Sequence, residues 1–158
     1  MISETFKMVQ DTYTPLLSEV LKKVHNAKTK EKKIEILRQY DCEPLRMIIK
    51  SSFDPKIVWN IPEGEVPYKA NTAEEGTEHT VLRREARKLY RFIKGGDTTI
   101  PGFRRENMFI QMLEGLHKSE AELIIAAKEK KLHQVYKGLS ATVVKEAFNW
   151  NDEFMRNE

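Results

Sequence analysis

Arginine is concentrated in one short part of the chain, between residues 83 and 105. This window carries eight basic residues against two acidic ones, which gives it a formal charge of +6. Because the planar guanidinium group makes paired hydrogen bonds with phosphate oxygens, arginine at this density favours a phosphate-bearing partner. The candidate phosphate- or nucleic-acid-binding residues are Arg83, Arg84, Arg87, Lys88, Arg91, Lys94, Arg104 and Arg105.

The spacing of these residues predicts how a helix would present them. Intervals of three, four and seven residues place side chains along one stripe of an α-helix. Four candidates follow these intervals: Arg84, Arg87, Lys88 and Arg91. The apolar face beside this stripe consists of Leu82, Ala86, Leu89 and Ile93. Tyr90 and Phe103 lie in the same window and would stack on bases if they are exposed. A second basic run, residues 22–33, would add solubility or extend a phosphate-binding surface.

An acidic segment, residues 62–79, offers another explanation for the arginines. It holds two prolines, two glycines and five glutamates against one lysine, a composition typical of an exposed connection. Because it directly precedes the Arg-rich stretch, it could pair with a solvated helix face. It could also fold back as a mask until a partner displaces it. The sequence leaves these alternatives open.

Motifs for catalysis or for binding a cofactor are not found. The pair Gly95-Gly96 follows a predicted helix, whereas a phosphate-binding glycine loop precedes one, so we expect a cap and a turn. The histidines are dispersed, and His79 in an acidic stretch is more typical of a surface histidine than of a metal ligand. Cys42 has no neighbouring His or Arg in the sequence, so we expect a partly buried thiol. We expect no enzyme, no cofactor and no metal site.

The elements that would position these residues are helices. Helical spacing of apolar residues recurs along the chain, and no stretch sustains the period-2 alternation of strands. We predict an all-α compact bundle of about seven short helices with one long acidic loop. Its parts are an N-terminal helical lobe (1–61), the acidic linker (62–79) and a C-terminal helical lobe (80–158), which share one core.

Capping residues predict where the helices begin. The start signals are Thr14-Pro15, Thr29, Asp41 or Glu43 before Pro44, Asp54-Pro55, a capping box of Ser119 with Glu122, and Ser140. A further short helix is expected over residues 3–13. The helix over 104–116 is apolar around more than half of its circumference, which places it at the centre of the core. Four aromatic residues would either close a small core or anchor an interface: Trp59, Tyr68, Trp150 and Phe154.

Several stretches of the chain resemble one family when they are taken together. They are AKTKEKKIEILRQYD (27–41), SFDPKIVWNIPEG (52–64), EEGTEHTVLRREARKLYRFIKGG (74–96), RRENMFIQMLEGL (104–116), SEAELIIAAKEKKL (119–132) and YKGLSATVVKEAFNW (136–150). In this order and spacing they resemble a family of small uncharacterised proteins of T4-like tailed phages, including cyanophages. The resemblance covers residues 27–150 and implies a viral protein of the host cytoplasm, with no catalytic residue to carry over.

Length and composition restrict the function without identifying it. The 158 residues suit one domain, and the single cysteine excludes an internal disulfide. No apolar run approaches the ~20 residues of a membrane span, so we expect a soluble intracellular protein. We predict a non-enzymatic phage accessory protein that binds nucleic acid or another polyanion. The alternatives are a module that binds or inhibits a host or phage protein, and a sponge for a phosphorylated nucleotide.

Overall fold

Helices form all the regular structure in the part of the chain that the structure describes. The computed structural model describes residues 14–71 and 79–156, and the helix predicted over residues 3–13 lies outside these ranges. The elements are α2 (Leu17–Asn26), α3 (Lys30–Gln39), α4 (Glu43–Phe53), α5 (Leu82–Glu85), the 3-10 helix η1 (Ala86–Phe92), α6 (Gly102–Gly115), α7 (Lys118–Lys128), α8 (Leu132–Val135) and α9 (Ala141–Phe148). The predicted all-α class is confirmed. None of the helices in these ranges has the length and apolar character needed to cross a membrane.

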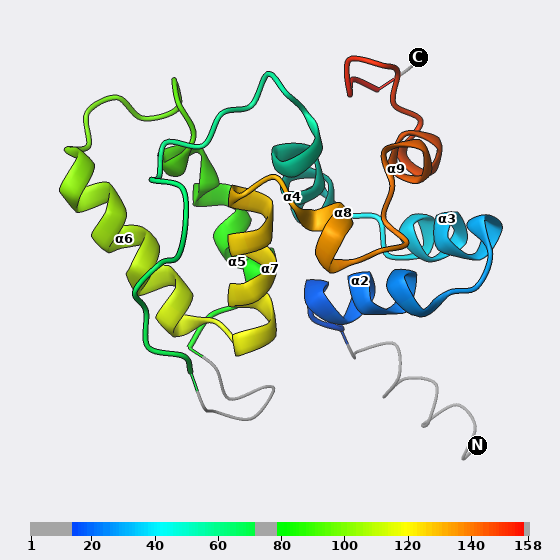
Figure 1. Cartoon of the computed structure of the whole chain (residues 1–158), viewed down its shortest axis with the longest axis horizontal. Coiled ribbons are helices and arrows are strands. Elements are labelled where there is room, and N and C mark those ends of the chain that lie inside the picture. Colours follow the sequence, from blue (N-terminus) through cyan, green and yellow to red (C-terminus); the bar gives the residue numbers. More distant parts are fainter. Residues whose placement is uncertain (1–13, 72–78, 157–158) are drawn as a thin grey trace, which may run out of the picture.

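Helix α7 occupies the centre of the hydrophobic core. Seven of its eleven residues are buried, and it packs against α2, α4, α6 and α8. Figure 1 shows α7 between α6 at one end of the molecule and α3 and α9 at the other. The predicted central position of the 104–116 helix is wrong, because α7 and η1 cover only one side of α6. A single core cluster joins residues from both halves of the chain.

A buried carboxylate at the start of α7 connects three helices. Glu120 is fully buried. Its Oε2 accepts a hydrogen bond from the backbone N–H of Leu17 at 3.1 Å, and its Oε1 accepts one from the N–H of Leu82 at 3.0 Å. These donors are the first residues of α2 and α5, whose N–H groups have no acceptor within their own helices. One side chain therefore caps two helices that are far apart in the sequence.

Hydrogen bonds at the helix starts confirm some predicted caps and correct others. Thr29 and Ser140 each accept a hydrogen bond from the N–H three residues later, both at 3.2 Å. The predicted capping box is wrong, because His117 is the N-cap of α7 and accepts from the N–H of Ser119. The start predicted at residues 14–15 is early, since α2 begins where the buried carboxylate caps it.

The Arg-rich stretch is not the continuous α-helix that its apolar spacing predicts. Helix α5 ends at Glu85, and residues 86–92 continue as the 3-10 helix η1. Residues three apart share one edge of a 3-10 helix. The buried edge of η1 consists of Ala86, Leu89 and Phe92. Phe92 thus takes the inward position predicted for Ile93, because a 3-10 turn advances the buried edge by three residues rather than by four.

The helix start predicted at Asp54-Pro55 is also wrong. The residues after α4 form a turn, in which Asp54 Oδ1 accepts the N–H two residues later at 2.9 Å. The chain then becomes extended and exchanges backbone hydrogen bonds with the segment that leaves η1. This pairing holds residues 58–60 out of a helix and places Trp59 in the core. There its indole N–H donates to a carbonyl of α4 at 3.2 Å.

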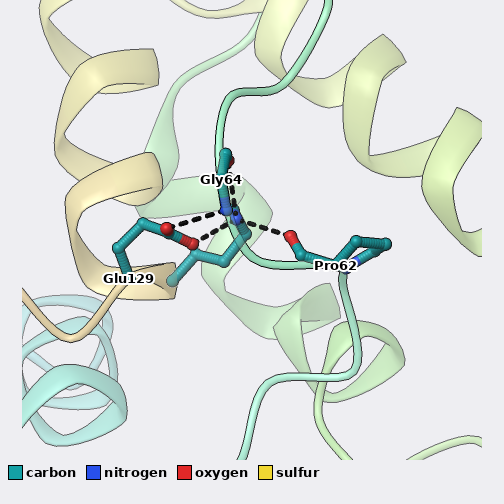
Figure 2. A network of polar contacts seen from close by, with 4 residues as sticks. Pro62, Gly64 and Glu129 are labelled. Carbon is teal, nitrogen blue, oxygen red and sulfur yellow. Dashed lines mark hydrogen bonds and ion pairs between the residues drawn. The ribbon is translucent and has the colours of Figure 1, made fainter.

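The described part of the acidic segment is fastened to α6 and α7. Lys128 Nζ donates to the carbonyls of Pro62 and Gly64 at 2.9 and 3.3 Å, and the Gly64 N–H donates to Glu129 at 2.9 Å (Figure 2). Further along, a glutamate of α6 accepts a backbone N–H of the segment at 2.8 Å. Residues 62–71 therefore form a surface strap alongside α6 and α7 (Figure 1) rather than a free linker.

We expect Glu120→Ala to lower the free energy of unfolding by roughly 2–4 kcal/mol, because two buried backbone N–H groups lose an acceptor. Glu120→Gln should have an intermediate effect, since an amide has one oxygen for these two donors. Urea denaturation measures both changes. The matched control is Glu122→Gln, which removes the same charge from an exposed position of α7. A Glu120→Ala variant as stable as the wild type would contradict the capping role.

Candidate functional site

The structure divides the eight candidate basic residues into a surface group and an internal group. Arg83 and Arg105 direct their guanidinium groups at the protein itself. Of the remaining six, Arg91 is partly exposed and the others are exposed. We call these six the basic seam, because they lie on η1, α6 and the residues beside them. The basic seam comprises Arg84, Arg87, Lys88, Arg91, Lys94 and Arg104.

Arg105 organises the backbone beneath the seam. Arg105 is only 6% exposed. Its Nε donates to the carbonyl of Arg91 at 3.0 Å, and its Nη2 donates to the carbonyls of Asp97 and Ile100 at 3.0 and 2.9 Å. A buried charge is tolerated when its donors are satisfied in this way. Arg105 therefore fixes the loop between η1 and α6 and is not available to a ligand.

Arg83 connects elements of the N-terminal half to α5. Its Nε and Nη2 donate to the carbonyl of Pro15 at 3.1 and 2.9 Å, and its Nη1 lies 3.3 Å from Cys42 Sγ. Cys42 and Arg83 are 41 residues apart in the sequence, so this contact exists only in the tertiary structure. Arg83, like Arg105, supports the fold beneath the seam.

The three seam residues on η1 are spread over two of its edges rather than along one stripe. With three residues per turn, Arg87 shares an edge with Tyr90, and Lys88 shares the next edge with Arg91. The Arg91 guanidinium carbon lies 5.9 Å from the centroid of the Tyr90 ring, a cation–π arrangement. Tyr90 is 47% exposed and Phe103 is 73% exposed. These two rings are therefore accessible to a partner, whereas Phe92, the third aromatic residue of the window, is buried.

Two hollows lie along the junction of η1 and α6. The first, of about 310 Å³, is lined by residues that include Arg91, Asp97, Thr99, Arg104 and Met108. The second, of about 330 Å³, is lined by residues that include Glu85, Lys88, Arg91, Met108 and Gln111. Because Arg91 and Met108 line both hollows, the two hollows are neighbours. The junction thus brings Lys88, Arg91 and Arg104 to one groove.

No side chain of the basic seam forms an ion pair with an acidic side chain of the described residues. The ion pairs in these ranges use basic groups elsewhere, such as Lys30 with Glu146 at 3.0 Å. The carboxylate in the first hollow, Asp97, accepts hydrogen bonds from the Thr99 hydroxyl at 2.6 Å and from its N–H at 2.9 Å. These bonds, with a smaller contribution from nearby arginines, hold the pKa of Asp97 below its usual range.

The acidic segment does not pair with the seam where the structure describes it. Residues 62–71 are held by α6 and α7 instead. Three of its glutamates, Glu74, Glu75 and Glu78, lie outside the described residues. Masking of the seam by this segment therefore stays a prediction.

The other candidate features of the sequence have structural positions. Within the described ranges, no group of three His, Cys, Asp or Glu side chains could hold a metal ion. Trp59 and Phe154 are buried, and Tyr68 and Trp150 pack against the core cluster. These aromatic residues therefore close the core, and the exposed aromatic surface of the seam comes from other positions.

Sequence reasoning missed the residues that shape the hollows. Asp97, Thr99 and Met108 belong to no motif and are brought together by the loop that Arg105 fixes. One usable signal was the three-residue spacing of Ala86, Leu89 and Phe92, which is typical of a 3-10 helix with one buried edge.

Comparison with known proteins identifies a family. The model described as "Family of unknown function (DUF6433)" matches residues 20–134, which is more than half of the chain. No curated protein and no solved structure matches this chain.

We expect substitution of Arg105 to destabilise the fold far more than substitution of the adjacent Arg104 does. Arg105→Met leaves three carbonyls without their donor and should lower the free energy of unfolding by about 3 kcal/mol or more. Arg104→Met should change it by less than about 0.5 kcal/mol, as is usual for an exposed side chain. Urea denaturation of both variants makes the comparison. Equal stability of the two would show that Arg105 does not hold the loop.

Proposed function

We propose that this chain, a member of the DUF6433 family of unknown function, is a non-enzymatic protein that binds nucleic acid through the basic seam. The observation that carries the proposal is an excess of positive charge at one junction. Six basic side chains gather on and beside η1 and α6, and none forms an ion pair within the described residues. A phosphate backbone would supply the missing negative charges.

Contacts with phosphate should dominate such an interaction. Arg84 and Arg87 are exposed, and the planar donors of their guanidinium groups suit phosphate oxygens. Phosphate contacts position a protein on nucleic acid but carry no sequence information. We therefore expect low sequence specificity and a steep loss of affinity with salt.

A protein-interaction module is the alternative that the exposed apolar surface would support. The large apolar side chains that are exposed in the described ranges come from separate segments of the chain: Val58, Tyr90, Phe103, Val135 and Met155. Two of these five lie within the Arg-rich window, beside the charges. Charge complementarity to phosphate thus has more support than an apolar interface with a host or phage protein.

The source and compartment of the protein form part of the proposal. Residues 27–150 resemble proteins of T4-like tailed phages, and we propose a phage origin and a role in the host cytoplasm on that ground. Nucleic acid of the host or the phage would be the polyanion available there.

We expect Arg84→Ala/Arg87→Ala/Arg91→Ala to weaken nucleic-acid binding about tenfold or more at low salt. Losing up to three phosphate contacts should also reduce the slope of log affinity against log salt by about 2–3. Fluorescence anisotropy with labelled DNA and RNA across a salt series measures both quantities.

The matched control removes the same charge from another face. Lys22→Ala/Lys28→Ala/Lys32→Ala changes three exposed lysines of the second basic run. We expect it to weaken binding clearly less than the arginine triple variant does. Equal losses would assign binding to overall charge rather than to the seam, and absence of binding by the wild type at low salt would contradict the proposed function.

A further inference from the structure

The basic seam combines positive charge with exposed aromatic rings. Phe103 is 73% exposed, which is unusual for a phenylalanine, and it directly precedes Arg104 in the first turn of α6. Tyr90, 47% exposed, directly precedes Arg91 on η1. Arg91 and Arg104 in turn line the same hollow. Each ring is therefore the sequence neighbour of a guanidinium group at this hollow.

We infer that the junction of η1 and α6 takes single-stranded nucleic acid, with unpaired bases stacked on Phe103 and Tyr90 and phosphates held by the basic seam. The inference rests on the proposed function and specifies its substrate. An exposed phenyl ring gains little from a phosphate, because it has no hydrogen-bond donor or charge to offer. The ring makes a favourable stacking contact with a flat apolar surface, and the face of an unpaired base is such a surface.

A duplex would leave these rings uncovered. Its bases are stacked on one another, so only their edges and the phosphates face a protein. The seven-residue η1 also buries one of its three edges, which leaves the basic groups divided between the other two edges and α6. A flexible single strand can follow such a bent path and turn its bases toward the rings.

Asp97 separates the place of a base from the place of a phosphate. Its carboxylate lines the first hollow together with Arg91 and Arg104. An aspartate carboxylate is charged near neutral pH, so it would repel a phosphate inside the hollow. The same carboxylate can accept a hydrogen bond from the amino group of a base. Phosphates would therefore lie at the rim, near the guanidinium groups, and a base edge would face Asp97.

The turn that follows η1 lies close to the backbone of Tyr90. A Cβ atom at Gly96 would lie 1.9 Å from the carbonyl oxygen of Tyr90, so only glycine permits this close approach. The preceding Gly95 has φ +86°, a backbone conformation that favours glycine. The glycine pair thus permits the turn after η1 to pack closely against the Tyr90 carbonyl.

The test compares a labelled single strand with the duplex of the same sequence, using fluorescence anisotropy at one low salt concentration. We expect the wild type to bind the single strand at least tenfold more tightly. Phe103→Ala should weaken binding of the single strand fivefold or more and leave its salt slope unchanged, because a stacking contact releases no counterion. Phe103→Trp keeps a stacking surface and should retain the affinity. The matched control is Met155→Ala, which shortens an apolar side chain of similar exposure, 54%, elsewhere on the surface.

The outcomes separate this inference from the proposed function. If the duplex binds as tightly as the single strand and Phe103→Ala changes neither, the inference is overturned while the arginine-dependent binding still stands. If Phe103→Ala and the arginine triple variant both lose single-strand affinity, and only the arginine variant loses salt dependence, the inference is supported. If neither nucleic acid binds at low salt, the proposed function fails and the inference fails with it.

Discussion

The fold depends on a carboxylate that is removed from water and shared between two helix starts. Glu120 projects from the central helix α7 and accepts the first N–H groups of α2 and α5. An ionised group is costly to bury unless hydrogen bonds compensate it, and the ends of helices provide such donors. This arrangement fixes the N-terminal half of the chain and the beginning of the Arg-rich stretch to one point of the core. Helix η1 continues directly from α5, so the Arg-rich stretch starts from this anchored segment.

Arginine has two different uses within one stretch of this chain. Arg105 is buried and organises three backbone carbonyls, while the adjacent Arg104 is exposed. Arg83 likewise binds the backbone of another segment, whereas Arg84 is free to meet a ligand. Composition cannot separate these uses, because both need the same side chain. The two uses are separated by the direction of each side chain. Arg83 and Arg105 lie on the sides of α5 and α6 that face the rest of the fold, and Arg84 and Arg104 lie on the exposed sides.

The sequence predicted the elements better than it predicted their boundaries and packing. The starts capped by Thr29 and Ser140 were predictable because capping is a local interaction between a side chain and its own turn. The helix expected at Asp54-Pro55 fails because long-range pairing of residues 58–60 with the end of η1 favours extended backbone. The inward face of η1 was missed because α-helical and 3-10 spacing share residues 86 and 89 and diverge only at the next apolar position.

By itself, the sequence determined the all-α class, several helix caps and a concentration of arginine within residues 83–105. These features depend on local periodicity and on composition, which need no knowledge of distant contacts. Only the tertiary structure decided which six basic groups reach the surface and that Phe103 and Tyr90 stand exposed beside them. It also decided that Asp97 shares a hollow with two of the arginines. The physical reason is that burial and charge pairing depend on contacts between segments remote in the sequence.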